Sequence, residues 1–257
     1  MQPLLISILT FMLLLGGTMV GARLRGALPK HHLSEESKDI AKTGIGFLAT
    51  LCALVLGLLI ASAKTSYDNR SEEVIRAATQ IVLLDRNLRQ YGPEADSTRA
   101  LLHRIVTTRA GLLWPESIGP TSAPRTDGTP QSASMSIEDL QRQLRELSPA
   151  GNSQRLILDR ALHLSQDLAE TRWLAIEQTI GSIPVPFLVL LIFWLTVIAT
   201  CIGIYAPRNR TLAAVALACS LSTATAIFLV LEMDRPFEGL LRVSDAPLRD
   251  AIAYLER

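Results

Sequence analysis

Four stretches of the chain contain no Asp, Glu, Lys or Arg, and they limit the possible folds more than any other feature. They cover residues 1–22, 43–63, 178–207 and 211–231. A helix needs about 20 apolar residues to cross a hydrocarbon core of about 30 Å, and each stretch is long enough. A helix of a water-soluble protein seldom runs this far without a charge, because one of its faces meets water. The sequence therefore predicts a membrane protein with four spans.

The remaining residues divide the chain into further parts. We expect transmembrane helices at 1–22, 43–63, 184–206 and 211–232, a charged connector at 23–42, a soluble domain at 64–183 and a polar C-terminal tail at 233–257. The segment 64–183 carries 14 basic and 15 acidic residues, which is a balanced, water-compatible composition. The sequence thus predicts an all-α fold, in which an α-helical soluble domain is inserted between the second and third of four transmembrane helices.

Helix signals place the elements of the inserted domain. No Gly or Pro separates the second span from the amphipathic residues that follow, so one helix is expected to leave the membrane and stop at Gly92-Pro93. Ser136 and Asp139 resemble a capping box that opens a short helix. A longer helix is expected after Gly151 and up to Gly181. Residues 115–135 are rich in Pro, Ser, Thr and Gly, and we expect a flexible loop there.

Small residues recur every four positions on two of the predicted membrane helices. They are Ala49, Ala53, Gly57 and Ala61 on the second helix, and Ala214, Ala218 and Ser222 on the fourth. Such rows allow two helix backbones to approach closely. The pattern favours a tight helix bundle, within one chain or between chains; a role of these helices around a pore is the other interpretation.

Two segments where helices leave the membrane resemble bacterial bestrophins. Leu58-Leu59 and then Thr65-Ser66-Tyr67-Asp68-Asn69-Arg70 are similar to the segment by which the second bestrophin helix enters the cytosolic domain. Leu231-Glu232-Met233-Asp234-Arg235-Pro236-Phe237-Glu238-Gly239 is similar to the acidic segment after the last bestrophin helix. With Arg242-Val243-Ser244, the tail also resembles the uncharacterised bacterial family named for a bestrophin-like domain. The order of parts agrees as well.

The resemblance implies an oligomeric anion channel, with two departures. The paired Trp that follows Tyr-Asp in true bestrophins is replaced by Asn69-Arg70-Ser71. The acidic run that forms the calcium clasp of animal bestrophins is missing, because Gly239-Leu240-Leu241 follows Glu238. Calcium gating is therefore not expected, and anion conduction, with chloride as the example, is carried over by analogy.

Polar residues beside the spans are the candidate functional groups. Tyr67, Asp68 and Arg70 are candidates for a pore mouth, with Arg70 attracting anions; an interfacial Tyr with ordinary helix charges is the alternative. A second set, Asp234, Arg235, Pro236 and Phe237, is a candidate coupling turn, with Phe237 docking into the helical domain. Charges that simply collect where a helix meets the interface are the alternative here.

Several function classes are disfavoured. No nucleophile–base pair, glycine-rich phosphate loop or metal-ligand cluster is visible, so we expect no enzyme and no cofactor. The formal net charge of +1 gives no reason to expect a nucleic-acid partner. The three Cys residues fall inside predicted spans, which excludes a disulfide framework in the soluble part.

Lys and Arg are divided almost evenly between the two sides of the predicted spans, so the positive-inside rule does not fix the orientation. The first span alone, which is followed but not preceded by basic residues, favours a soluble domain outside. The resemblance favours a multi-pass protein of the plasma (inner) membrane with the domain in the cytoplasm, and we adopt that expectation.

Two hypotheses for the function follow. The first is a homo-oligomer in the lipid bilayer that conducts ions, anions being expected. The second is a membrane-anchored helical scaffold or sensor module without a pore.

Overall fold

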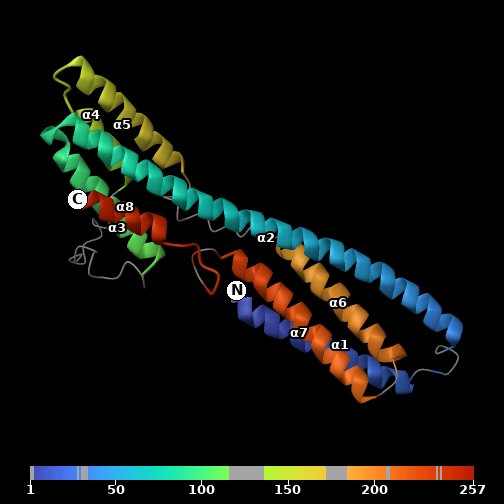
Figure 1. Cartoon of the computed structure of the whole chain (residues 1–257). Helices are drawn as coiled ribbons and strands as arrows, with labels where there is room; N and C mark the ends of the chain where they lie inside the picture. Colours follow the sequence, from blue (N-terminus) through green and yellow to red (C-terminus); the bar gives the residue numbers. More distant parts are fainter. Residues whose placement is uncertain are drawn as a thin grey trace. The chain divides into compact units, whose positions relative to one another are not determined.

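The computed structural model describes residues 3–27, 29, 34–115, 136–171, 184–206, 209–235, 237 and 239–257. All regular structure in these residues is helical, which confirms the predicted all-α class (Figure 1). The elements are α1 (Pro3–Ala27), α2 (Glu35–Tyr91), the short 3-10 helix η2 (Pro93–Ala95), α3 (Asp96–Leu113), α4 (Ile137–Glu146), α5 (Asn152–Glu170), α6 (Val185–Tyr205), α7 (Arg210–Met233) and α8 (Ala246–Leu255).

Four of these helices are long and apolar enough to cross a membrane, namely α1, α2, α6 and α7. Each overlaps one of the four charge-free stretches, in the predicted order. Length and composition therefore give the same four candidate membrane helices that the sequence indicates.

Helices α1 and α2 extend beyond the charge-free stretches. The predicted connector 23–42 is largely helical, because α1 continues to Ala27 and α2 begins at Glu35. Acidic residues in the first turn of α2 complement the positive end of the helix dipole. Ion pairs three residues apart support the same turns: Lys38 Nζ lies 2.6 Å from Glu35, and Lys42 Nζ lies 3.0 Å from Asp39. A charge-free stretch indicates the part of a helix that crosses the membrane. The helix itself can continue into charged residues on either side.

Helix α2 runs unbroken for 57 residues and stops where the sequence indicates. Gly92 has φ +124°, a backbone conformation that residues with a side chain rarely adopt. Pro93 then begins η2. The Gly-Pro pair thus ends one helix and starts the next.

The chain forms two compact units. The first, called the membrane unit below, contains Met1–Tyr67 and Gly181–Leu241. The second, called the helical unit below, contains Asp68–Ile180 and Arg242–Arg257. Helix α2 contributes residues to both. In the first unit α1 packs against α6 and α7 (Figure 1). A buried cluster joins Cys52, Leu59 and Ala63 of α2 to Leu191 of α6 and Val230 of α7.

Glycines make the crossing of α1 and α6 unusually close. A Cβ atom placed on Gly203 would collide with the carbonyl oxygen of Thr18 and lie 2.9 Å from the backbone nitrogen of Ala22. A Cβ placed on Gly21 would collide with the carbonyl oxygen of Thr200. Backbone atoms cannot rotate away, so both positions require glycine. Thr18 and Thr200 donate their hydroxyls to carbonyls of their own helices, which leaves this contact free of unpaired hydroxyls.

The second unit has an apolar core built by the distal part of α2 with α3, α4, α5 and α8. Its largest fully buried side chains are Val74, Ile81, Leu84, Leu88, Leu102, Val106, Leu140, Leu144, Leu168 and Leu248. This unit includes the C-terminal residues, which the sequence analysis had interpreted as a polar tail. That interpretation is wrong for 246–255, because α8 buries Leu248, Ala251, Ile252 and Leu255 and contacts α3.

Two predicted segments lie largely outside the described residues. One is the expected loop 115–135, of which residues 116–135 lie outside the described residues. Helix α5 ends at Glu170, and the remainder of the helix expected up to Gly181 lies outside the described residues from 172 onward.

The start of α4 is predicted to respond to pH. The backbone N–H of Ser136 donates to Asp139 Oδ2 at 3.1 Å, and this bond lowers the pKa of Asp139 below its ordinary value. The pKa of Glu138 is also lowered, first by a hydrogen bond from the Ser136 side chain. A carboxyl whose pKa is lower in the folded state stabilises that state above the unfolded-state pKa of about 4, and the benefit is lost as pH falls through the folded value.

We therefore expect Asp139→Asn to be less stable than the parent at pH 6, and this difference to shrink as the pH falls below about 4. Equilibrium unfolding of both proteins at pH 6 and near pH 3 measures this. A stability difference that is the same at both pH values would contradict the capping role of the ionised carboxylate.

Candidate functional site

The small-residue row on α2 is uncovered within the chain. Ala49, Ala53, Gly57 and Ala61 are all exposed, and a Cβ atom added at Gly57 would meet nothing within 4 Å. The residues that α2 buries in the first unit, Cys52, Leu59 and Ala63, lie on a different side of the same helix. Of the four candidate membrane helices, α2 has the smallest buried share. The row is therefore available to another chain, to lipid or to water.

The row on α7 is uncovered in the same way. Ala214, Ala218 and Ser222 are exposed, while the buried residues of this helix include Ser220, Ala224 and Ile227. The two predicted rows thus do not contact each other inside one chain. The close glycine contact of the membrane unit is instead the α1–α6 crossing, to which Gly17 and Gly21 belong.

The residues predicted for a pore mouth lie in the middle of α2. The boundary between the two units falls between Tyr67 and Asp68, with Tyr67 half-buried and Asp68 exposed. Arg70 Nη1 lies 3.5 Å from Glu73 Oε2, and both side chains are about one-third exposed or less. The positive charge of Arg70 is therefore partly balanced by a neighbour on its own helix.

The predicted coupling turn follows α7 directly. Asp234 is the C-cap of that helix, and the backbone N–H of Arg235 donates to the carbonyl of Glu232 at 3.1 Å. Asp234, Arg235 and Phe237 are all half-buried, and Pro236 lies outside the described residues. The most buried polar side chain of this region is Glu232, which is 4% exposed and accepts a hydrogen bond from the backbone N–H of Leu240. The structure therefore brings Glu232, which was not among the proposed coupling residues, into the centre of this turn.

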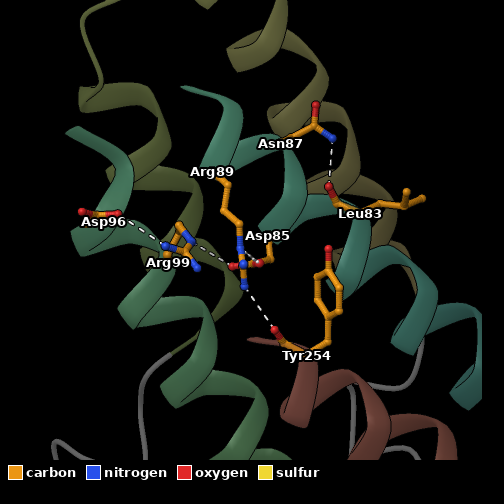
Figure 2. Close-up of polar contacts among 7 residues, drawn as sticks. All are labelled: Leu83, Asp85, Asn87, Arg89, Asp96, Arg99 and Tyr254. Atoms are coloured by element: carbon orange, nitrogen blue, oxygen red, sulfur yellow. Dashed lines mark hydrogen bonds and ion pairs between the residues drawn. The ribbon is translucent and has the colours of Figure 1, made fainter. Parts of the chain in front are cut away.

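A buried carboxylate in the second unit escaped the sequence analysis. The side chain of Asp85 is 2% exposed and each of its oxygens accepts from an arginine: Arg89 Nε at 2.6 Å and Arg99 Nε at 2.9 Å (Figure 2). Arg89 also donates through Nη2 to the carbonyl of Tyr254 at 3.1 Å, and its guanidinium carbon lies 5.3 Å from the centre of that ring.

This Asp85 cluster connects three helices through one carboxylate. Asp85 and Arg89 belong to α2, Arg99 to α3 and Tyr254 to α8 (Figure 2). The Tyr254 carbonyl is among the last four of α8, and it accepts from Arg89 as well as from the backbone N–H of Arg257, so Arg89 helps to cap α8. The only visible signal in the sequence was the i,i+4 spacing of Asp85 and Arg89, which also occurs on solvated helix faces. Among the described residues no group of three or more His, Cys, Asp or Glu is placed to hold a metal ion.

A family model for the bestrophin-like domain matches residues 12–248 of the sequence. The chain belongs to the bestrophin-like family. The match reaches into both units and into all four candidate membrane helices, so this bestrophin-like chain is a membrane protein. Comparison with curated proteins gives no significant match.

Solved structures give the same fold for this bestrophin-like chain. A bacterial bestrophin homologue from Klebsiella pneumoniae, in a tryptophan-to-alanine variant, is 14% identical, with 97% of this chain and 95% of that chain covered and a TM-score of 0.68. An isoleucine-to-threonine variant from the same organism is 12% identical, covers 98% and 99%, and has a TM-score of 0.66. A protein described only as a membrane protein, in a proline-to-alanine variant, is 12% identical, covers 97% of both chains and has a TM-score of 0.65.

Proposed function

We propose that the chain assembles into a symmetric homo-oligomer in the lipid bilayer, with the uncovered row of α2 around a central path for ions. The observation that carries this proposal is the exposure of Ala49, Ala53, Gly57 and Ala61 on the least buried membrane helix. Exposed positions on α1 and α6 carry bulky side chains such as Leu4, Ile8, Phe187 and Phe193, as suits lipid contact. The small residues of α2 instead suit close contact between chains or a narrow path.

The chemistry of the path is a finer part of the proposal. Anions such as chloride are the expected cargo because the family resembles bestrophin anion channels. Arg70 contributes less to this choice than the sequence indicated, since Glu73 balances part of its charge. The same resemblance supports a plasma (inner) membrane location with the helical unit in the cytoplasm. We further propose that the protein is no enzyme and that ion movement needs no cofactor.

Substitution of Gly57 tests the proposed path. Gly57→Leu places a large side chain on the uncovered row, where no described residue lies within 4 Å of the added Cβ atom. We expect a chloride flux through reconstituted vesicles at least tenfold below that of the parent, or loss of the oligomer, while the monomer still folds. Gly16→Leu is the matched control, because Gly16 of α1 also has nothing within 4 Å. Unchanged assembly and flux in Gly57→Leu would show that the row has no such role.

The alternative, an anchored helical scaffold or sensor, makes a different prediction. Replacing the membrane helices by unrelated apolar helices would spare a scaffold that acts through its helical unit, but it would abolish a channel.

A further inference from the structure

The turn after α7 is fixed by a buried carboxylate. Glu232, in the last turn of α7, accepts a hydrogen bond from the backbone N–H of Leu240, eight residues further on. Gly239 has φ +85°, and a Cβ atom there would collide with the Glu232 carboxylate. Only glycine both adopts this backbone conformation and leaves room for the carboxylate. The position of Leu240 is thereby tied to the end of α7.

A second contact holds the chain three residues later. The indole Nε1 of Trp114, at the end of α3, donates to the carbonyl of Val243 at 3.1 Å. Trp114 is 4% exposed and Val243 is 3% exposed, so this hydrogen bond is shielded from water. A shielded bond is costly to break, because its donor and acceptor lose a partner that water does not replace. Helix α8 begins at Ala246, directly after this point.

Between the two fixed points the chain is short and carries no regular structure. Only Leu241 and Arg242 separate Leu240 from Val243, and both are exposed. An extended chain covers at most about 3.6 Å per residue, so Leu240 and Val243 are at most about 11 Å apart. A displacement of either end is therefore passed to the other once this small reach is used.

We infer that residues 240–243 form a strap of limited length, which makes the docking of α8 in the second unit depend on the last turn of α7 in the first unit. This inference goes beyond the proposed conduction and holds for a scaffold as well as for a channel. Because linkage is reciprocal, loosening the Val243 end also loosens the Glu232 end.

Hydrogen exchange of the full-length protein in nanodiscs tests the strap. Glu232→Leu removes the acceptor at similar volume, and we expect amides of α8 to exchange about tenfold faster, as for loss of a hydrogen bond to a charged group. Glu232→Gln keeps an acceptor oxygen, and its α8 amides should stay within about threefold of the parent.

Insertion of four glycines between Leu241 and Arg242 lengthens the strap. It therefore distinguishes an effect transmitted through the strap from a general loss of stability. In this longer chain Glu232→Leu should leave α8 exchange unchanged relative to the insertion alone. An equal acceleration with and without the insertion, or no acceleration of α8 in either chain, would overturn the inference. If Glu232→Leu does not fold, Trp114→Phe tests the reverse direction: exchange of the Leu240 amide should accelerate, and an unchanged Leu240 amide would equally overturn it.

Discussion

Gly203→Ala is expected to destabilise the membrane unit by about 3 kcal/mol, at the upper end of the usual cost of overpacking. The added methyl group would collide with the carbonyl oxygen of Thr18 and approach the backbone nitrogen of Ala22 to 2.9 Å. Backbone atoms of a helix cannot give way individually, so α1 and α6 have to separate and lose their contact along several turns. Thermal unfolding in detergent, followed by circular dichroism, measures the loss.

Gly16→Ala provides the matched control for this prediction, because Gly16 lies outside the small-residue row of α2. It introduces the same methyl group into another membrane helix, where nothing lies within 4 Å. Alanine favours a helix over glycine by up to about 1 kcal/mol, so the monomer should be as stable as the parent or slightly more stable. Equal stability of Gly203→Ala and Gly16→Ala would show that the α1–α6 crossing is not as close as described.

Asp85→Ala is expected to lower the stability of the helical unit by about 2–3 kcal/mol and to loosen α8. Removing one partner of a fully buried ion pair costs about 3–5 kcal/mol. We expect less here because the side chains of Arg89 and Arg99 are 32% and 25% exposed and regain some water. Arg89 would no longer be held where it caps the Tyr254 carbonyl, so α8 should lose protection first. Denaturant unfolding gives the stability, and hydrogen exchange gives the order of loss.

Asp96→Ala serves as the control for the charge of the Asp85 cluster. Its carboxylate also contacts Arg99, but at 3.4 Å and with the side chain 67% exposed. An exposed pair of this kind contributes at most about 1 kcal/mol, so a small change is expected. If both substitutions had the same effect, the burial of Asp85 would not be the source of its contribution.

Features with a local cause could be predicted from the sequence. The four spans follow from the absence of charge, the end of α2 follows from Gly92-Pro93, and the start of α4 follows from Ser136 and Asp139. In each case the physical cause lies within a few neighbouring residues, so no knowledge of the tertiary structure is needed.

The missed features depend on tertiary contacts. The bond from Arg99 to Asp85 forms only because α3 folds back beside α2, and the crossing of Gly21 with Gly203 joins helices far apart in the sequence. The small-residue rows were visible, but the sequence did not show that both would be uncovered within one chain. Helix α8 was missed because its polar composition was judged as a whole. Pro247 in its first turn, with Leu248, Ala251, Ile252 and Leu255 at helical spacing, was the available signal.

The role of Glu232 illustrates a third kind of difference. The sequence indicates Asp234, Arg235, Pro236 and Phe237 as the coupling turn. The structure instead buries Glu232, because the left-handed Gly239 brings the Leu240 N–H to its carboxylate. Which carboxylate of a group turns inward depends on the path of the following loop, and sequence spacing does not specify that path.

The mass of the purified complex in nanodiscs tests the central claim most directly, before any measurement of flux. A silent channel and a protein without a pore look alike in a flux assay, whereas their masses need not agree. The proposal predicts one closed ring of identical 28.1 kDa chains. A monomer or a dimer would contradict it, since neither encloses a central path, and the anchored helical module would then be the better account.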